Sequence, residues 1–225
     1  MQTKLVIFDN DGVLVDSEVI IKDALVDAYA AQSIAIEREW AFKHLQGLSS
    51  RDNALAVQEF SGQPVDADLM IDTYIAQFKA RMREELNPTP HIFKALETLR
   101  EEGVKLSVAT SGGLETTYEK FSVTALDQFF EKENIIGAEL VAKGKPAPDI
   151  FLLAAKRQGI APEDCAVVED SVAGVKGAVA AGMQAIGYIG ASHAPYTGED
   201  YKDRLMDAGA DVVIDDHLSL MDVLR

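Results

Sequence analysis

The sequence predicts an α/β fold: a three-layer, Rossmann-like core with a parallel sheet, plus an inserted all-helical cap domain. Three observations predict it. Short apolar runs alternate with helical patterns over most of the 225 residues. These runs are continuously apolar, as in parallel strands that are covered on both faces. One long block near the N-terminus, in contrast, contains helical patterns only.

Five apolar runs are the expected strands. In chain order they span 5–8, 106–109, 166–168, 185–189 and 212–214. Their lengths are typical of buried strands. Helical patterns lie between most of them, at 90–102, 114–126, 148–158, 172–181 and 200–208. This alternation favours a parallel sheet with helices on its two faces.

The segment from about 18 to 86 breaks the alternation. Its helical patterns cover 18–32, 37–45, 49–60 and 66–85. Apolar residues recur at helical spacing in the first and last of them, at Leu25, Ala28 and Tyr29 and at Leu69, Tyr74, Ile75 and Phe78. An all-helical block of this length inside an α/β domain is typical of an inserted domain. We therefore expect a core of residues 1–16 and 88–225 and a cap of residues 17–87, rather than one α/β domain with extra helices.

Composition excludes several classes of partner. The formal net charge is −16, with 48% hydrophobic and 26% charged residues, as in a globular protein with an acidic surface. Such a charge repels nucleic acid and anionic membrane surfaces. No apolar run approaches the length of a membrane span. Cys165 is the only cysteine, so no internal disulfide forms, and a cytoplasmic location is expected.

The first candidate site follows the first apolar run. In open α/β sheets, ligands bind beyond the carboxyl ends of the strands. Asp9 and Asp11 stand there, and Gly12 allows the chain to turn. Buried carboxylates require a cation or strong donors nearby, although a turn capped by an Asx side chain is the simpler interpretation. An EF-hand loop is excluded because Gly12 directly follows Asp11.

Two further groups follow later runs. Thr110, Ser111 and Gly112 open a helix, where hydroxyls and free amides can bind an anion. Lys145 stands in a loop with two prolines, which restrict where its side chain points. Each group taken alone is also an ordinary loop.

A second acidic pair, Glu169 and Asp170, follows the run at 166–168. Ser171 after it is a candidate N-cap for the next helix. Two acidic pairs at neighbouring strand ends can hold Mg²⁺, which typically uses one or two carboxylates together with substrate phosphate and water.

Taken in order, these groups resemble the four motifs of the haloacid dehalogenase superfamily. The likeness is to its phosphatase branch with a helical cap, which includes β-phosphoglucomutase and sugar phosphatases, and it spans essentially the whole chain. The first motif is similar to residues 9–18, the second to Thr110, the third to Lys145 with Pro146, and the fourth to 169–171.

The resemblance implies a role for each residue. Asp9 would be the nucleophile that forms an aspartyl-phosphate, and Asp11 the general acid and then base. Thr110 would bind a phosphoryl oxygen, and Lys145 would offset repulsion between two anions. The implied cofactor is Mg²⁺, held by Asp9, the main-chain carbonyl of Asp11, and Asp170, with Glu169 ligating directly or through water. Main-chain amides at Gly12, Ser111 and Gly112 are the expected phosphate donors.

The resemblance also places a specificity loop in the cap, at residues 46–52. Its candidate substrate-binding residues are Gly47, Ser50 and Arg51. Arg51 can either grip a second anionic group of the substrate or lie on the helix surface, and both interpretations stay open. His193, after the fifth run, is interpreted as a solvated loop histidine that can also line the mouth of the site.

The predicted function is magnesium-dependent hydrolysis of small phosphorylated metabolites, with sugar phosphates as the expected substrates. A phospho-signalling receiver is disfavoured because it has no counterpart of the helical insert. A haloacid dehalogenase is disfavoured because the resemblance implies that dehalogenases lack an acid at Asp11.

A β-phosphoglucomutase-like phosphotransferase shares all four motifs and remains the alternative. That pattern has a histidine where this chain has Ile21, and an arginine where it has Ser50. Arg51 is one residue further along, a shift of about 100° on a helix. These departures favour hydrolysis.

Overall fold

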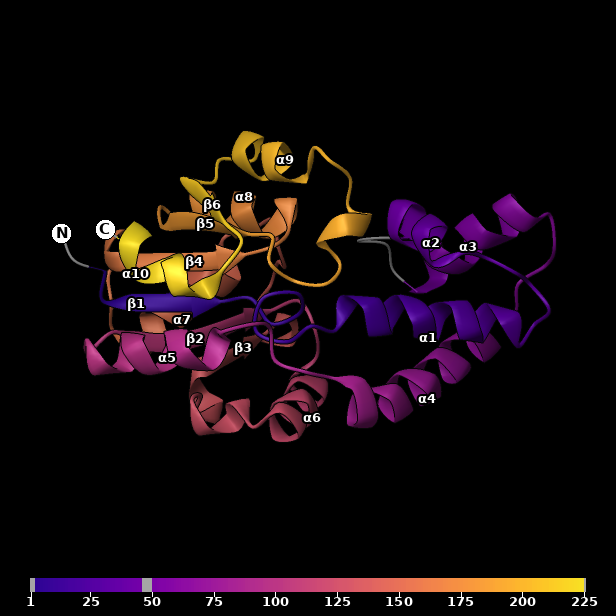
Figure 1. The fold of residues 1–225 in the computed structure, drawn as a ribbon, viewed down its shortest axis with the longest axis horizontal. Helices are drawn as coiled ribbons and strands as arrows, with labels where there is room; N and C mark the ends of the chain where they lie inside the picture. The colour runs from indigo at the N-terminus through magenta and orange to yellow at the C-terminus, as the bar shows by residue number, and fades with distance from the viewer. Residues whose placement is uncertain (1–2, 46–49, 225) are drawn as a thin grey trace.

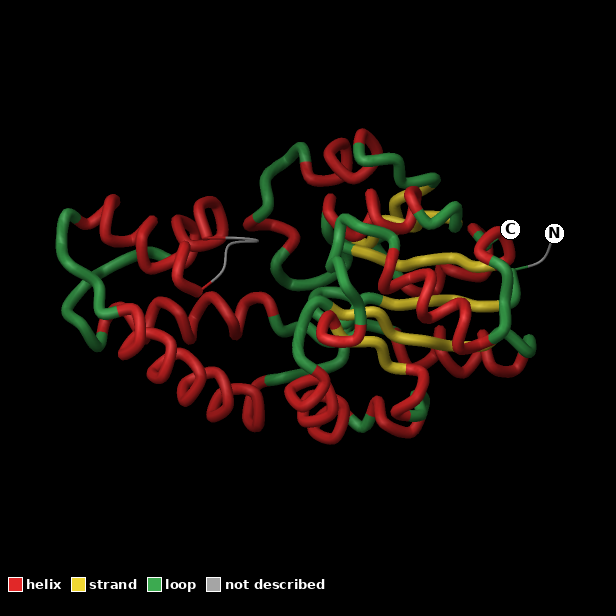
Figure 2. The backbone as a smooth tube through the Cα atoms, turned by 180° about the vertical axis from the view of Figure 1, so that it is seen from behind, coloured by secondary structure: helices red, strands yellow, loops and turns green. Residues whose placement is uncertain are grey.

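A computed structural model describes residues 3–45 and 50–224 (Figures 1 and 2). Within these residues six strands form one parallel sheet, in the order β3-β2-β1-β4-β5-β6. The strands are β1 (Leu5–Phe8), β2 (Lys105–Thr110), β3 (Ile135–Gly137), β4 (Cys165–Glu169), β5 (Gln184–Tyr188) and β6 (Val212–Ile214). The central strand β1 pairs in parallel with β2 on one side and β4 on the other. The strand order therefore reverses beside β1, and such a switch point is where open sheets bind ligands.

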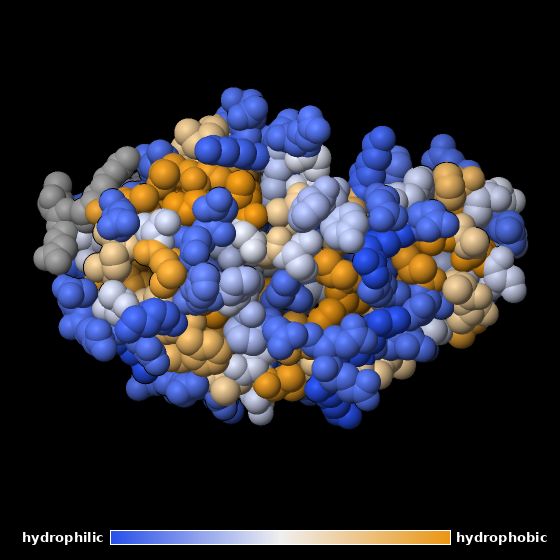
Figure 3. All heavy atoms as spheres, in the orientation of Figure 1, coloured by the Kyte–Doolittle hydropathy of each residue, from blue (hydrophilic) through white to orange (hydrophobic). Residues whose placement is uncertain are grey.

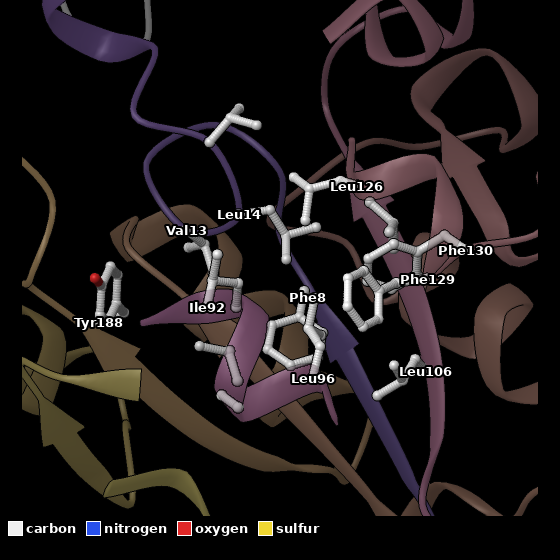
Figure 4. Packing of buried hydrophobic residues seen from close by; sticks show 14 of the residues in the cluster. Phe8, Val13, Leu14, Ile92, Leu96, Leu106, Leu126, Phe129, Phe130 and Tyr188 are labelled. Atoms are coloured by element: carbon white, nitrogen blue, oxygen red, sulfur yellow. The ribbon is translucent and has the colours of Figure 1, made fainter. Parts of the chain in front are cut away.

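Burial on both faces explains the continuously apolar runs. Alternate side chains of a strand point to opposite faces of the sheet. In β1, Val6 and Phe8 join one hydrophobic cluster, and Leu5 and Ile7 join another. Phe8 lies close to Leu96 in the first cluster (Figure 4). Every position of β1 is therefore buried, and none is free to be polar.

Helices cover the two faces and confirm the three-layer α/β fold. The first cluster takes side chains from α5 (Ile92–Glu101), α6 (Leu114–Thr124) and α10 (Leu220–Val223). The second takes them from α7 (Asp149–Gln158), α8 (Val172–Ala180) and α9 (Tyr201–Asp207). In the part of the chain that is described, no helix combines the length and apolarity that a membrane crossing requires.

The expected helices between 18 and 86 are present. They are α1 (Glu18–Ala30), α2 (Arg38–Leu45), α3 (Ser50–Ser61) and α4 (Ala67–Glu85). They share a third hydrophobic cluster, which includes Leu25, Ala28 and Tyr29 of α1. These helices lie together at one end of the molecule, where α1 and α4 run side by side (Figure 1).

The chain enters and leaves this helical region through two adjacent segments. The main-chain amide of Asp16 donates to the carbonyl of Asn87 at 2.9 Å, and Thr89 donates to Leu14 at 3.0 Å. We therefore retain, as a proposal, a cap of residues 17–87 on a core of residues 1–16 and 88–225.

The expected number of strands was wrong, whereas the helix expected at 66–85 is present with a partly different buried face. The sequence suggested five strands, but Ile135–Gly137 adds β3 at one edge of the sheet. On α4, Leu69 and Ile75 are 50% and 44% exposed although they follow the helical spacing of apolar residues. The helix instead buries Met70, Phe78 and Met82.

The surface is mainly polar. Hydrophilic side chains cover most of the face in Figure 3, with smaller apolar areas between them. This surface agrees with the large excess of acidic residues in the composition.

The loop after β1 is anchored from the core. The Nε2 atom of His217 lies 3.0 Å from the carbonyl oxygen of Val13 and 3.1 Å from Thr89 Oγ1. The Thr89 hydroxyl also donates to the carbonyl of Val13. Since His217 is fully buried, burial lowers its pKa to about 4, and the ring is neutral near pH 7. These contacts fix the loop that carries the first acidic pair.

Candidate active site

A cavity of about 380 Å³ lies at the carboxyl ends of β1, β2 and β4. It brings together candidate residues from all four groups: Asp9, Asp11, Thr110, Ser111, Gly112, Lys145, Glu169 and Asp170. Helix α1 contributes Glu18, Ile21 and Lys22 to the same cavity. The strand ends that sequence analysis singled out therefore meet in one place.

Asp9 and Lys145 form the buried ion pair of this cavity. The Lys145 ammonium lies 2.5 Å from Asp9 Oδ1, donates to the carbonyl of Ala109 at 2.8 Å, and also donates to Glu169. Burial would lower the pKa of Lys145, but the charges of Asp9 and Glu169 raise it above its usual value. Lys145 is therefore a fixed positive charge rather than a solvated loop lysine.

For Asp9, the effect of burial on the pKa outweighs that of the neighbouring positive charge. Burial raises the pKa of Asp9 well above its usual value, and the charges of Glu169 and Asp170 raise it further, although Lys145 opposes both effects. One lysine does not compensate three buried carboxylates. The site as it stands lacks positive charge.

The three carboxylates form a site that fits a divalent cation. One oxygen from each of Asp9, Glu169 and Asp170 lies within 4.8 Å of the other two, and all three residues are buried. Burial is the main cause that raises the pKa of Asp170 to about 6. An all-oxygen donor set that is short of positive charge suits Mg²⁺.

Glu169 is held rigidly within this cluster. Its Oε2 accepts hydrogen bonds from the amide of Ser171 at 3.0 Å and from the Ser171 hydroxyl at 2.9 Å. The same hydroxyl accepts from the amide of Gly174 at 2.9 Å, so Ser171 is the N-cap of α8, as the sequence suggested. A methyl group on Gly174 would overlap the Glu169 carboxylate. The start of α8 is thus shaped around this acid.

His193 supports Asp170 and is not solvated, so that interpretation was wrong. The ring is fully buried, and its Nε2 atom lies 3.3 Å from Asp170 Oδ2 and 3.2 Å from the hydroxyl of Tyr201. That hydroxyl donates to the main-chain carbonyl of Asp170. Burial would lower the pKa of His193, but the Asp170 carboxylate raises it above its usual value.

Gly12 is required where the loop after β1 passes Asp170 and His193. Its φ angle is +80°, which favours glycine. A Cβ atom there would lie 2.1 Å from Asp170 Oδ2 and 2.8 Å from His193 Cε1. The glycine therefore permits both the turn and the close approach of the two acidic segments.

Asp11 is held by a lysine that sequence analysis missed. Lys120 of α6 and Ser17 both donate to Asp11 Oδ1, and Asn10 donates to Oδ2 at 3.2 Å. Burial would raise the pKa of Asp11, but the charge and hydrogen bond of Lys120 lower it below its usual value. Lys120 is buried and lies over the ring of Phe78, 5.3 Å from its centroid.

A second cavity adjoins the first at Asp11. It measures about 420 Å³ and shares Asp11, Ile21 and Gly112 with the first cavity, the one at the ends of β1, β2 and β4. Tyr74 and Phe78 of α4 give it an apolar wall. Asp11 thus faces both the first cavity and space between α4 and α6.

The group of Thr110, Ser111 and Gly112 lies at the end of β2 and is held in place by a hydrogen bond. Thr110 is buried, and its Oγ1 accepts a hydrogen bond from the amide of Gly112 at 3.0 Å. Ser111 and Gly112 line the cavity beside it. The loop therefore places Thr110 and Ser111 at the cavity, whereas the amide of Gly112, an expected phosphate donor, is engaged by Thr110.

The candidate cap residues are not brought to this cavity. Arg51 is 71% exposed and pairs with Asp68 of α4 at 2.9 Å. Neither Ser50 nor Arg51 is among the described residues that line the cavity, and Arg51 instead borders a hollow beside Ala54. The structure therefore favours a surface role for Arg51. Gly47 lies outside the described residues.

Comparison with known proteins identifies relatives over nearly the whole chain. Hexitol phosphatase A of Escherichia coli is 30% identical over 200 residues, covering 88% of this chain and 89% of its own. A phosphorylated carbohydrates phosphatase of Thermotoga maritima is 31% identical over 214 residues, covering 91% of each chain. A β-phosphoglucomutase of Bacillus subtilis is 30% identical over 191 residues, covering 82% of each.

Solved structures agree with the sequence relatives. A conserved haloacid dehalogenase-like protein from Agrobacterium tumefaciens has a TM-score of 0.85 and 32% identity, covering 98% of this chain and 96% of its own. The family of haloacid dehalogenase-like hydrolases matches residues 6–188. These findings confirm the resemblance seen in the motifs. The chain belongs to the haloacid dehalogenase-like hydrolases.

Proposed function

We propose that this chain is a magnesium-dependent phosphatase of small phosphorylated carbohydrates that acts through an aspartyl-phosphate on Asp9. The observation that carries the proposal is the single cavity that joins Asp9 and Lys145 to the acidic cluster. Relatives named as phosphatases of hexitol phosphates and phosphorylated carbohydrates support the substrate class.

The first chemical step transfers the phosphoryl group to Asp9. A carboxylate oxygen of Asp9 bonds to phosphorus while the bond from phosphorus to the leaving oxygen breaks. The proton of the Asp11 carboxyl group moves to that leaving oxygen. In the second step Asp11 takes a proton from water, the water oxygen bonds to phosphorus, and the bond to Asp9 breaks.

Fixed donors stabilise the charge in both steps. Thr110, Lys145, Ser111 and Gly112 line the cavity where phosphate would sit. The amide of Gly12, an expected phosphate donor, instead donates to the carbonyl of Val15 at 2.8 Å. Asp9, Asp170 and the Asp11 carbonyl would hold magnesium, with Glu169 ligating directly or through water. Bound magnesium supplies positive charge to the phosphate and to its ligands.

The pKa shifts explain why metal and substrate are both required. The pKa of Asp9 is raised, although a nucleophile must be ionised, and a nearby dication would lower it. The pKa of Asp11 is lowered, although an acid must carry a proton, and a bound phosphate anion would raise it. Each carboxyl group therefore reaches its working state only in the loaded site.

A panel of phosphate esters tests the proposal. The purified chain with magnesium is supplied with hexitol phosphates, sugar phosphates and nucleoside monophosphates, and released phosphate is measured. We expect release from the carbohydrate esters, loss of release with chelator, and recovery with magnesium but poorly with calcium. Release from none of these esters, or undiminished release after exhaustive chelation, would contradict the proposal.

Phosphotransfer between sugar positions is the second candidate, because the B. subtilis relative is a β-phosphoglucomutase. Ile21 lines both cavities at the position where that pattern has a histidine, and its side chain exchanges no proton. We therefore favour water as the acceptor. The deciding assay supplies β-glucose 1-phosphate with a trace of the 1,6-bisphosphate. Glucose 6-phosphate forming much faster than free phosphate would establish phosphotransfer instead.

A further inference from the structure

Lys22 is a second buried lysine in the catalytic cavity, and it comes from the cap helix α1. Its side chain is only 6% exposed, and it lines the same cavity as Asp9 and Asp11. Among the described residues that line this cavity, Lys22 and Lys145 are the two basic ones. Lys145 is engaged by Asp9 and Glu169, so it serves the reacting end of the substrate.

The Lys22 ammonium has more N–H donors than it has acceptors among the described residues. Among the described residues, its hydrogen-bond acceptor is Glu18, one turn earlier on α1, at 3.3 Å. The ammonium also lies 5.4 Å from the centroid of the Phe42 ring. A lysine carries three N–H donors, and burying an ammonium without acceptors is unfavourable. An anionic group of a substrate would supply the missing acceptors.

Lys22 shares its single positive charge between Glu18, at 3.3 Å, and any anion that enters the cavity. Glu18 and Asp11 also line the cavity and already make it acidic. A phosphate ester would bring a charge of about −1.5 to −2 to this place, whereas a carboxylate brings a single charge. A carboxylate therefore fits the local charge better than a second phosphate does.

We propose that Lys22 binds a carboxylate of the substrate, so that the preferred substrates are phosphorylated sugar acids. This inference rests on the proposed phosphatase function and narrows its substrate class. The catalytic cavity, about 380 Å³ in volume, has Lys22 in its wall and gives room for an open carbon chain beyond the phosphate. Lys22 would then act as a specificity residue, and Asp9 and Asp11 would perform the same chemistry on any ester that fits.

A matched pair of substrates tests the proposal. Sorbitol 6-phosphate and 6-phosphogluconate have the same six-carbon open chain and the same phosphate, and differ by a hydroxymethyl or a carboxylate group at the far end. We expect the wild type to have the higher kcat/KM for 6-phosphogluconate. Lys22→Met should lower that value about 10- to 100-fold, the worth of a hydrogen bond to a charged group. Its loss on sorbitol 6-phosphate, which comes only from leaving Glu18 unpaired in the cavity, should be at least about tenfold smaller.

Three control variants separate charge from structure. Lys22→Arg keeps the charge and should retain the preference for the carboxylate. Lys22→Gln provides a second neutral variant if Lys22→Met does not fold. Lys94→Met removes an exposed lysine of α5 that lines neither this cavity nor the cavities beside it, and should leave both kcat/KM values unchanged. Thermal melts of all variants report folding.

The outcomes distinguish the two proposals. Equal kcat/KM of the wild type on both substrates, or equal losses on both in the neutral variants, would overturn the carboxylate assignment and leave the phosphatase standing. A higher kcat/KM for glucose 1,6-bisphosphate than for 6-phosphogluconate would also overturn it. No phosphate release from any of the three would contradict the phosphatase proposal, and this inference with it.

Discussion

Replacing Gly174 by alanine perturbs the acidic cluster without removing any of its groups. Gly174 lies in the first turn of α8, and a Cβ atom there would come 1.8 Å from Cδ of Glu169 and 1.9 Å from Oε1. These separations are far shorter than any non-bonded contact. Glu169 is buried, so its carboxylate has to leave the position in which it meets Lys145 and Ser171.

Two energies of opposite sign decide the stability of this variant. Alanine is favoured over glycine inside a helix by about 1 kcal/mol. Breaking a buried, hydrogen-bonded ion pair is unfavourable by about 3–5 kcal/mol. The second effect is larger, and Gly174→Ala should lose about 2–4 kcal/mol of unfolding free energy. Because Glu169 also positions Lys145 beside Asp9, a displacement on the order of 1 Å should lower kcat about 100-fold.

The assay combines urea unfolding with phosphate release. Lys176→Ala is the matched control, because Lys176 is exposed on the same helix and should change neither quantity. A Gly174→Ala protein that is more stable than the wild type and equally active would refute the argument from packing around Glu169.

Three further predictions concern residues around the site. Burial lowers the pKa of His217 to about 4, so the unfolded chain binds a proton that the folded chain does not. The unfolding free energy should therefore fall by about 1 kcal/mol from about pH 7.5 to about pH 5.5, and His217→Gln should remove this component in urea titrations. Lys120→Met should raise the pKa of Asp11, because Lys120 is the partner that favours the ionised carboxylate. The part of the pH profile of kcat/KM that reports Asp11 should then shift to higher pH. An unshifted profile would contradict the role of Lys120 beside Asp11. Arg51→Ala should leave kcat/KM within about twofold for every substrate, since Arg51 pairs with Asp68 outside the cavity; a loss confined to substrates with two anionic groups would restore its binding role.

The core of the site could be predicted because its residues follow buried strands directly. Asp9, Thr110 and Glu169 each stand where an apolar run ends, and the parallel sheet brings those ends to one edge. The cap helices and the central strand could also be predicted from the sequence. Helical spacing and continuous apolarity are local properties of the chain, so no knowledge of distant contacts is needed.

Residues that approach the site from elsewhere gave no local signal. Lys120 lies within a helix, His193 lies in a loop, and Lys22 lies on the first cap helix, and each looks like an ordinary surface residue in sequence. Lys120 is buried where α6 meets Asp11, and Lys22 is buried beside Phe42 of α2. Arg51 shows a different case, because the sequence left open a substrate contact or a place on the helix surface, and the structure has an exposed ion pair. Likewise the three residues of β3 are too few to show a strand pattern.

The central claim is that Asp9 is the nucleophile of a phosphatase. The most direct measurement is phosphate release by Asp9→Asn, compared with the wild type at saturating magnesium and substrate, with a thermal melt to show that both are folded. Acid-quenched reactions with labelled substrate are analysed in parallel for a phosphoryl group on the peptide that contains Asp9. The account predicts label on that peptide in the wild type, and neither label nor release in the folded variant. A folded Asp9→Asn protein that retains even about a tenth of the wild-type rate would contradict it, because losing the attacking oxygen should raise the barrier far beyond a tenfold effect.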